Sequence, residues 1–166
     1  MSGASADRPI RGSADRQPGD PATPLPRAGR LLCVDPGAKR IGLAVSDPTQ
    51  TVAQPLATLA RRAGRRFPLA ALRPFLEAHA VVGVVVGLPV EPSGREGPAA
   101  LAARQAGTLV SQRTGLPVTF VDERMSTARA RRAASGATRR ERPTAEAVDQ
   151  MAAAVILQTF LDRRRA

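Results

Sequence analysis

The sequence is poor in aromatic residues. Only 2% of its 166 residues are aromatic, and it contains neither Trp nor Tyr. A hydrophobic content of 43% still fits one globular domain, whose core must then be built from Leu, Val, Ile and Ala. Proteins that hold unpaired bases usually stack them on aromatic rings. If this chain binds nucleic acid, it must do so mainly through charge and backbone geometry.

Cysteine and long apolar segments are also scarce. Cys33 is the one cysteine, so no disulfide can form within the chain, as in proteins of a reducing cytoplasm. We expect Cys33 to be a small buried residue rather than a nucleophile. The longest apolar run, residues 81–90, is far too short to cross a bilayer, and no secretory signal is visible. These features predict a cytoplasmic protein without membrane association.

Acidic residues are outnumbered, and lysine is nearly absent. The chain has 25 Lys and Arg against 14 Asp and Glu, a formal net charge of +11. Compositional bias toward Arg can explain the number of cations, but it does not explain where they lie. The single lysine, Lys39, stands in the turn that follows Asp35. The charge favours a polyanionic partner, with nucleic acid first and an anionic membrane or acidic protein second.

The chain divides into a polar N-terminal segment and one domain. Residues 1–29 are rich in Pro, Gly, Ser, Ala, Asp and Arg and contain few large apolar residues. Such a segment buries too little surface to fold, so we expect a disordered tail. Residues 30–166 form the predicted folded domain.

Two short apolar runs flank a polar turn near the start of this domain. Residues 31–34 and 41–45 have strand character, and Pro36 with Gly37 turns the chain between them. The predicted hairpin presents Asp35 at a strand end and Lys39 with Arg40 at its tip. That arrangement suits a metal and a phosphate, although an ordinary hairpin with a solvated turn explains it equally well.

The remaining pattern predicts an α/β fold. We expect a third strand confined to a sheet edge by Pro55, and a central strand buried on both faces. The expected later elements are strands 51–59, 81–88 and 117–121 and helices 68–78, 98–114, 126–136 and 145–161. This order gives a five-stranded mixed sheet, with three antiparallel strands followed by two parallel ones and helices on both faces.

Acidic residues stand at three points of this predicted fold. Asp35 and the pair Asp122 and Glu123 follow strands that end at one end of the sheet, and the last helix carries Asp149 in its first two turns. A favourable interaction with the helix dipole explains Asp149 as well as a functional role does. Converging carboxylates would suit Mg²⁺ or Mn²⁺ and the hydrolysis of phosphodiester bonds.

Four blocks of this sequence resemble the YqgF/RuvX family in order and spacing. They are residues 35–44, 86–89, 122–127 and 148–154, and the resemblance covers residues 30–162. It implies an RNase H-like fold and a cytoplasmic nuclease that processes the 5′ end of pre-16S rRNA in ribosome biogenesis. Ribosomal precursor particles would be the partners, and the protein would be a monomer or a homodimer. An older proposal for this family is a Holliday-junction resolvase acting on branched DNA.

The resemblance also implies roles for individual residues. The catalytic and metal-binding acids would be Asp35, Glu123 and Asp149, with Mg²⁺ or Mn²⁺ as cofactor. The residues that contact substrate phosphates would be Lys39, Arg40 and Arg124. Whether Asp122 or Glu91 joins the acidic site is left open, and Ser126 and Thr127 would cap the next helix or orient Glu123.

One departure from the wider RNase H-like superfamily affects this assignment. Those nucleases usually carry their second acid at the end of the fourth strand, where this chain has Gly87. Glu123 comes from the fifth strand instead and must reach across toward Asp35.

Two other classes of protein share parts of the pattern. The first hairpin resembles the phosphate loop of the sugar-kinase, Hsp70 and actin ATPases, but those proteins need a second domain for which this chain has no room. A non-catalytic RNA-binding protein of ribosome assembly is the other alternative, and the basic composition together with the missing fourth-strand acid favours it.

Overall fold

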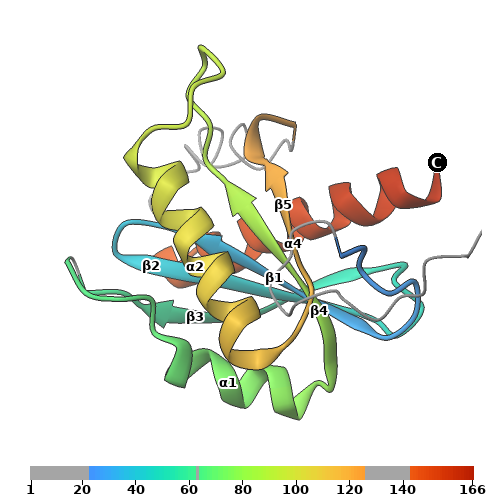
Figure 1. The fold of residues 1–166 in the computed structure, drawn as a ribbon. Coiled ribbons are helices and arrows are strands. Elements are labelled where there is room, and N and C mark those ends of the chain that lie inside the picture. Colours follow the sequence, from blue (N-terminus) through green and yellow to red (C-terminus); the bar gives the residue numbers. More distant parts are fainter. Residues whose placement is uncertain (1–22, 63, 126–142) are drawn as a thin grey trace, which may run out of the picture.

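The computed structural model describes residues 23–62, 64–125 and 143–166, and its centre is one five-stranded sheet (Figure 1). The strand order is β3-β2-β1-β4-β5. The strands are β1 (Arg30–Pro36), β2 (Arg40–Ser46), β3 (Ala53–Ala60), β4 (Val81–Leu88) and β5 (Val118–Asp122). The helices are α1 (Leu69–Ala78), α2 (Pro98–Thr114), the 3-10 helix η1 (Glu123–Met125) and α4 (Ala145–Arg165).

The predicted sheet is confirmed. β1 pairs antiparallel with β2, and β2 pairs antiparallel with β3. β4 lies parallel to both β1 and β5, so it is the buried central strand that its continuous apolar run predicted. β3 is an edge strand, and its pairing shifts register next to Pro55, which cannot donate a backbone hydrogen bond.

The helices begin and end largely where the sequence predicts. Pro98 opens α2, Gly115 follows it in the left-handed conformation with φ 73°, and His79 is the C-cap of α1. The Thr144 side chain caps α4 by accepting a hydrogen bond from the Ala147 N–H at 3.2 Å. The predicted helix 126–136 lies outside the described residues. In the part of the chain that the structure describes, no helix is long and apolar enough to span a bilayer.

Residues 23–29, the described part of the predicted tail, lie against the domain. The Leu25 side chain is buried at 6% exposure, and the Arg164 guanidinium donates a hydrogen bond to the Leu25 carbonyl at 2.7 Å. The Gln50 side-chain amide donates to the Pro26 carbonyl at 2.9 Å. The ordered contacts of the domain therefore begin before Arg30. Residues 1–22 lie outside the described residues.

Alternation along the strands assigns each side chain to one face of the sheet. In β1, Leu32 and Val34 pack in the core cluster that α1 and α2 cover, whereas Leu31 and Cys33 pack in the cluster that α4 covers. Asp35 continues the second series and therefore points to the α4 face. In β4, Val85 belongs to the α4 face, so Gly87 does too.

The approach of α4 to β2 is unusually close. Gly42 of β2 pairs with Asp35 of β1, and a Cβ atom at position 42 would overlap the backbone carbonyl of Asp149 in α4. Small buried residues on both surfaces, Ala44 in β2 and Ala153 in α4, allow the same approach further along. Because Gly42 has no side chain, the first turns of α4 lie directly over the strand pair that carries Asp35.

Gly42→Ala is expected to destabilise the fold by about 1–3 kcal/mol, because the added methyl group must displace backbone rather than a flexible side chain. The measurement is urea unfolding followed by far-UV circular dichroism, since the chain has no Trp or Tyr to report by fluorescence.

Gly83→Ala is the matched control on the same face of the sheet. Its methyl group would meet the flexible ends of Leu25 at 2.8 Å and Leu31 at 3.2 Å. It should cost less than Gly42→Ala, and an equal or greater loss of stability would contradict the argument.

Candidate active site

Asp35 is a nearly buried carboxylate at the end of β1. Its residue is 3% exposed and lies on the face of the sheet that α4 covers. The neighbouring positions on this face are Gly42 on β2, which is its paired residue, and Gly87 on β4, one step beyond the Val34–Val86 pair. The carboxylate thus lies between two positions without side chains.

Glu123 occupies the space over Gly87. It begins η1 directly after β5, and a Cβ atom at position 87 would lie 3.0 Å from its Oε1 atom and 3.2 Å from Ile156 of α4. β4 lies between β1 and β5, so Glu123 reaches over the end of β4 toward the strand that carries Asp35. The glycine that replaces a fourth-strand acid therefore makes room for an acid from the fifth strand.

Cys33 is a buried thiol on the same face of the sheet as Asp35. The thiol is fully buried, as the sequence predicted, and burial raises its pKa well above the usual range. The negative charge of Asp35, and after it that of Glu123, raises the pKa of Cys33 further. Asp35 and Glu123 therefore act electrostatically on the same buried atom. The protonated, enclosed thiol is unsuited to act as a nucleophile.

Asp149 forms an ion pair with Arg40. The Nε atom of Arg40 donates to Oδ2 of Asp149 at 2.6 Å, with side chains 42% and 20% exposed, respectively. This hydrogen bond, followed by the charge of the carboxylate, raises the pKa of Arg40. The two Nη groups of Arg40 make no hydrogen bond within the described residues. The guanidinium can therefore hold Asp149 and still donate to a substrate phosphate.

Asp122 and Glu91, the two acids whose part in the acidic site the sequence did not decide, contact other groups. Arg124 binds both carboxylate oxygens of Asp122, with an Nη2–Oδ2 distance of 2.7 Å, and this hydrogen bonding lowers the pKa of Asp122. Glu91 folds onto its own loop, where a Cβ atom at Gly97 would lie 2.7 Å from its Oε1 atom. Arg124 also approaches that loop at Gly94. Lys39 stands exposed in the β1–β2 turn, as predicted.

The three predicted acids lie at the same end of one sheet face but do not form a closed cluster. Within residues 23–62, 64–125 and 143–166, no three His, Cys, Asp or Glu side chains are arranged to hold a metal ion. The carboxylate of Asp149 is directed to Arg40, whereas Asp35 and Glu123 lie around Cys33. The three-carboxylate metal site stays a prediction. Ser126 and Thr127 lie outside the described residues.

Sequence reasoning missed two parts of this arrangement. Gly42 and Gly87 determine where Asp149 and Glu123 lie, yet the sequence pattern gave Gly42 no role beyond its place in the strand 41–45 and marked Gly87 only as the position of a missing acid. Both glycines stand in strands among large apolar residues, which is the pattern expected where another segment approaches closely.

The fold defines the class of protein. The structure is similar to that of Thermus thermophilus RuvC in complex with a Holliday junction substrate, with a TM-score of 0.51 and 20% identity. The similarity covers 83% of this chain and 96% of the RuvC chain. At this level of identity the similarity establishes the architecture alone, which is an RNase H-like fold.

Sequence similarity assigns the chain to a family. A family model described as "RuvX: Holliday junction resolvase" matches residues 29–163, and the chain belongs to this family. A protein of Paracoccus denitrificans is 46% identical over 145 residues, which are 87% of this chain and 90% of the relative. A protein of Koribacter versatilis is 41% identical over 136 residues, 82% and 88% of the two chains. Both relatives carry the name "Putative pre-16S rRNA nuclease". The family description and the names of both relatives are those of nucleases.

Gly87→Ala is expected to displace the Glu123 carboxylate, because the new methyl group would fill the space that its Oε1 atom borders. We expect nuclease activity to fall at least tenfold while the free energy of unfolding changes by less than about 1.5 kcal/mol, since the methyl meets only side-chain atoms. The paired measurements are a cleavage assay and urea unfolding. Full activity in a normally folded Gly87→Ala variant would show that the position of Glu123 is unimportant.

Proposed function

We propose that this protein hydrolyses phosphodiester bonds of precursor 16S rRNA, at or near its 5′ end, during ribosome assembly in the cytoplasm. The names of the relatives support the substrate. The observation that supports the proposal is the position of Glu123 beside Gly87 of β4, the strand next to the one that carries Asp35.

The donor atoms at this end of the sheet are of the chemical type that a hard divalent cation prefers, although the described side chains are not arranged as a closed metal site. Their donors are carboxylate oxygens, the ligands that Mg²⁺ and Mn²⁺ prefer. The Glu123 carboxylate lies next to Gly87 of β4, the strand that neighbours Asp35. The ligands we propose are Asp35, Glu123 and Asp149. Bound there, such an ion would supply Lewis-acid activation of water and charge stabilisation at the phosphate.

Cations next to the acids would position the substrate. Arg40 contacts Asp149 through Nε and keeps its Nη groups for a phosphate oxygen, so one guanidinium would connect the acidic site and the substrate. Lys39 lies beside it at the exposed tip of the hairpin. Arg124 lies on the opposite side, after β5, and its 39% exposed side chain can reach a second phosphate from its ion pair with Asp122.

A non-catalytic role in RNA binding is the second candidate function. The Arg40–Asp149 ion pair favours it, because an arginine neutralises one of the three acids and no three-carboxylate cluster exists among the described residues. The description of the matched family adds branched DNA as an alternative substrate for the catalytic role.

The test is cleavage of a pre-16S leader RNA and a four-way DNA junction by purified protein with Mg²⁺ or Mn²⁺. We expect metal-dependent cleavage of the RNA that EDTA abolishes. Asp35→Asn, Glu123→Gln and Asp149→Asn should each lower the rate by about a hundredfold or more, because each removes a charged oxygen ligand worth several kcal/mol. RNA binding should persist in these variants, since they remove negative charge.

Asp162→Asn is the matched control, because Asp162 is an exposed acid at the far end of α4 and pairs with Arg165. It should leave cleavage unchanged. RNA binding without cleavage by the wild-type protein, unchanged by Asp149→Asn, would favour the non-catalytic role. Cleavage of the junction alone would assign the DNA substrate.

A further inference from the structure

A loop rich in arginine lies beside the candidate active site. It joins β3 to α1 and contains Arg61, Arg62, Arg65 and Arg66, which we call the arginine loop. The Arg61 N–H donates to the Lys39 carbonyl at 2.9 Å, and the Arg61 guanidinium donates to the Gly37 carbonyl at 3.2 Å. The loop is therefore attached at its start to the turn that follows Asp35.

The sheet sets the distance between this loop and the acids. Asp35 pairs with Gly42, and Gly42 pairs with Thr58, so the end of β3 lies two strand spacings, or about 10 Å, from β1. That distance corresponds to about three nucleotides of a helical strand with a rise of 3.4 Å. A polynucleotide bound at the acids would thus reach the start of the loop, at Arg61, within a few nucleotides.

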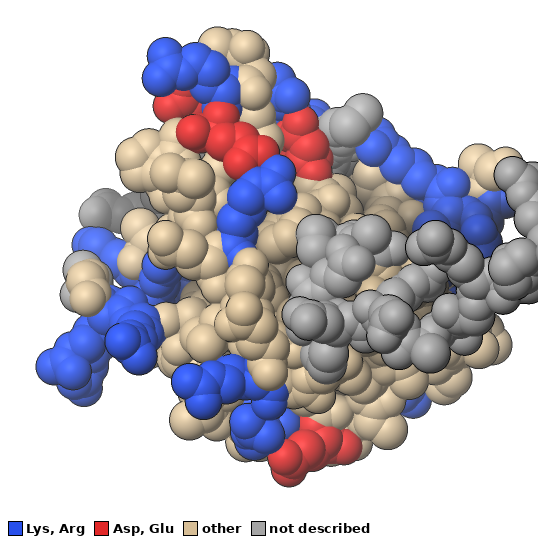
Figure 2. All heavy atoms as spheres, viewed as in Figure 1, with Lys and Arg blue, Asp and Glu red and all other residues tan. Residues whose placement is uncertain are grey.

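The charge of the arginine loop is not compensated. Residues 48–76 contain five arginines and no Asp or Glu. Arg62, Arg65 and Arg66 are exposed, and no arginine of the loop takes part in an ion pair within the described chain. Figure 2 shows cationic side chains projecting at the left, around the loop that follows β3 in Figure 1, with no acidic side chain among them.

The described arginines on the other side of the acids, in contrast, form ion pairs. Arg104 pairs with Glu96, and Arg124 pairs with Asp122. Acidic and basic side chains are accordingly interleaved at the top of Figure 2. A solvated loop of a generally Arg-rich protein would be expected to show the same mixture. Among the described residues around the site, the arginines of the arginine loop have no acidic partner, whereas Arg104 and Arg124 each have one.

We propose that the arginine loop binds the phosphate backbone of the polynucleotide and sets the direction in which the substrate leaves the active site. This inference rests on the proposed function, because the substrate must be a polynucleotide. Guanidinium groups bind phosphates whatever the bases, which agrees with a chain that has almost no aromatic residues for stacking. RNA and branched DNA offer the same phosphates.

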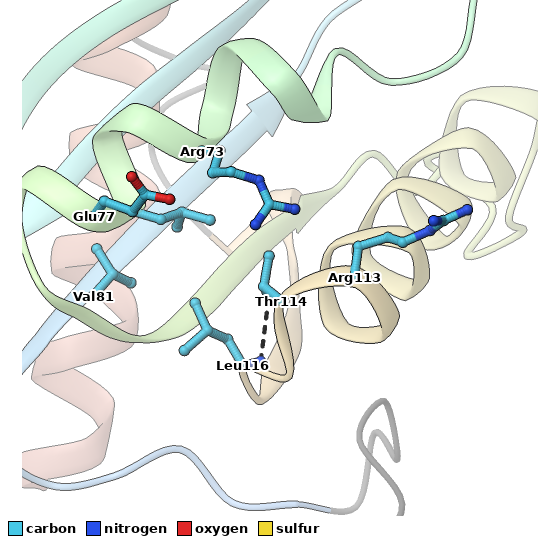
Figure 3. Close-up of a pocket in the computed structure, with 7 residues that line it drawn as sticks. Arg73, Glu77, Val81, Arg113, Thr114 and Leu116 are labelled. Atoms are coloured by element: carbon cyan, nitrogen blue, oxygen red, sulfur yellow. Dashed lines mark hydrogen bonds between the residues drawn. The ribbon is translucent and has the colours of Figure 1, made fainter.

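A second pair of exposed arginines provides a control far from the acids. Arg73 of α1 and Arg113 of α2 line a cleft of about 280 Å³ next to Val81, the first residue of β4 (Figure 3). In that view the Arg73 side chain extends toward Thr114, and Glu77 lies on the same helix. Val81 is about 23 Å along β4 from the end that Glu123 covers.

The experiment compares Arg65→Ala/Arg66→Ala with Arg73→Ala/Arg113→Ala, which removes the same charge. Arg61 is left intact, because its guanidinium also holds the Gly37 carbonyl. Binding of a pre-16S leader RNA and of a four-way DNA junction is measured in EDTA across a range of salt concentrations. For the loop variant we expect Kd for RNA to rise about tenfold at 0.15 M salt and the log–log salt slope to fall by about 1.4. The control should bind as the wild type does.

Two further readouts separate this proposal from a folding defect and from the proposed function. Arg65→Lys/Arg66→Lys should restore most of the affinity, and cleavage by the alanine variant at saturating RNA should match wild type, since the loop does not touch the reacting atoms.

Equal losses of RNA affinity in the loop and control variants, or no loss in either, would overturn the proposal. Loop-dependent binding by a protein that cleaves nothing would refute the nuclease and leave the loop assignment standing. Loss for the junction as well as RNA supports a site for the shared backbone, and loss for RNA alone supports one for RNA.

Discussion

The contact of the α4 backbone with β2 at Gly42 is the constraint on which the candidate site depends. With any side chain at that position, the helix would have to move away from the sheet, and Asp149 would move with it. Gly42 is also the hairpin partner of Asp35. One position without a side chain therefore sets how far apart an acid on a strand and an acid on a helix lie, and the Arg40–Asp149 ion pair forms at the same place.

A second glycine explains how this chain manages without an acid at the end of its fourth strand. The Glu123 carboxylate occupies the space over Gly87, so the same region of the α4 face is supplied with a negative charge from β5. If the proposed site requires a second carboxylate beside Asp35, the absence of a side chain at Gly87 leaves room for one from the neighbouring strand.

The order of the strands, their directions and the position of Asp35 follow from the sequence, because hydrophobic alternation, Pro55 and the turn at Gly37 are local signals. The family of the chain follows from four short blocks. Two contacts could not be predicted from the sequence, because each joins segments far apart in the chain. They are the ion pair of Asp149 with Arg40 and the hydrogen bonds of Arg61 to the β1–β2 turn. Alternation of apolar residues predicts the face of the sheet on which a residue lies. It does not predict how closely another segment approaches that face, which depends on positions without a side chain such as Gly42 and Gly87.

The most direct test of the central claim is a crystal structure of the protein grown with Mn²⁺, using anomalous scattering to locate the ion. The account predicts an anomalous peak at the ends of β1 and β5, bound by oxygens of Asp35 and Glu123, with the Glu123 side chain packed over Gly87. A Glu123 side chain turned away from Gly87, or Mn²⁺ bound only by residues other than these acids, would contradict it.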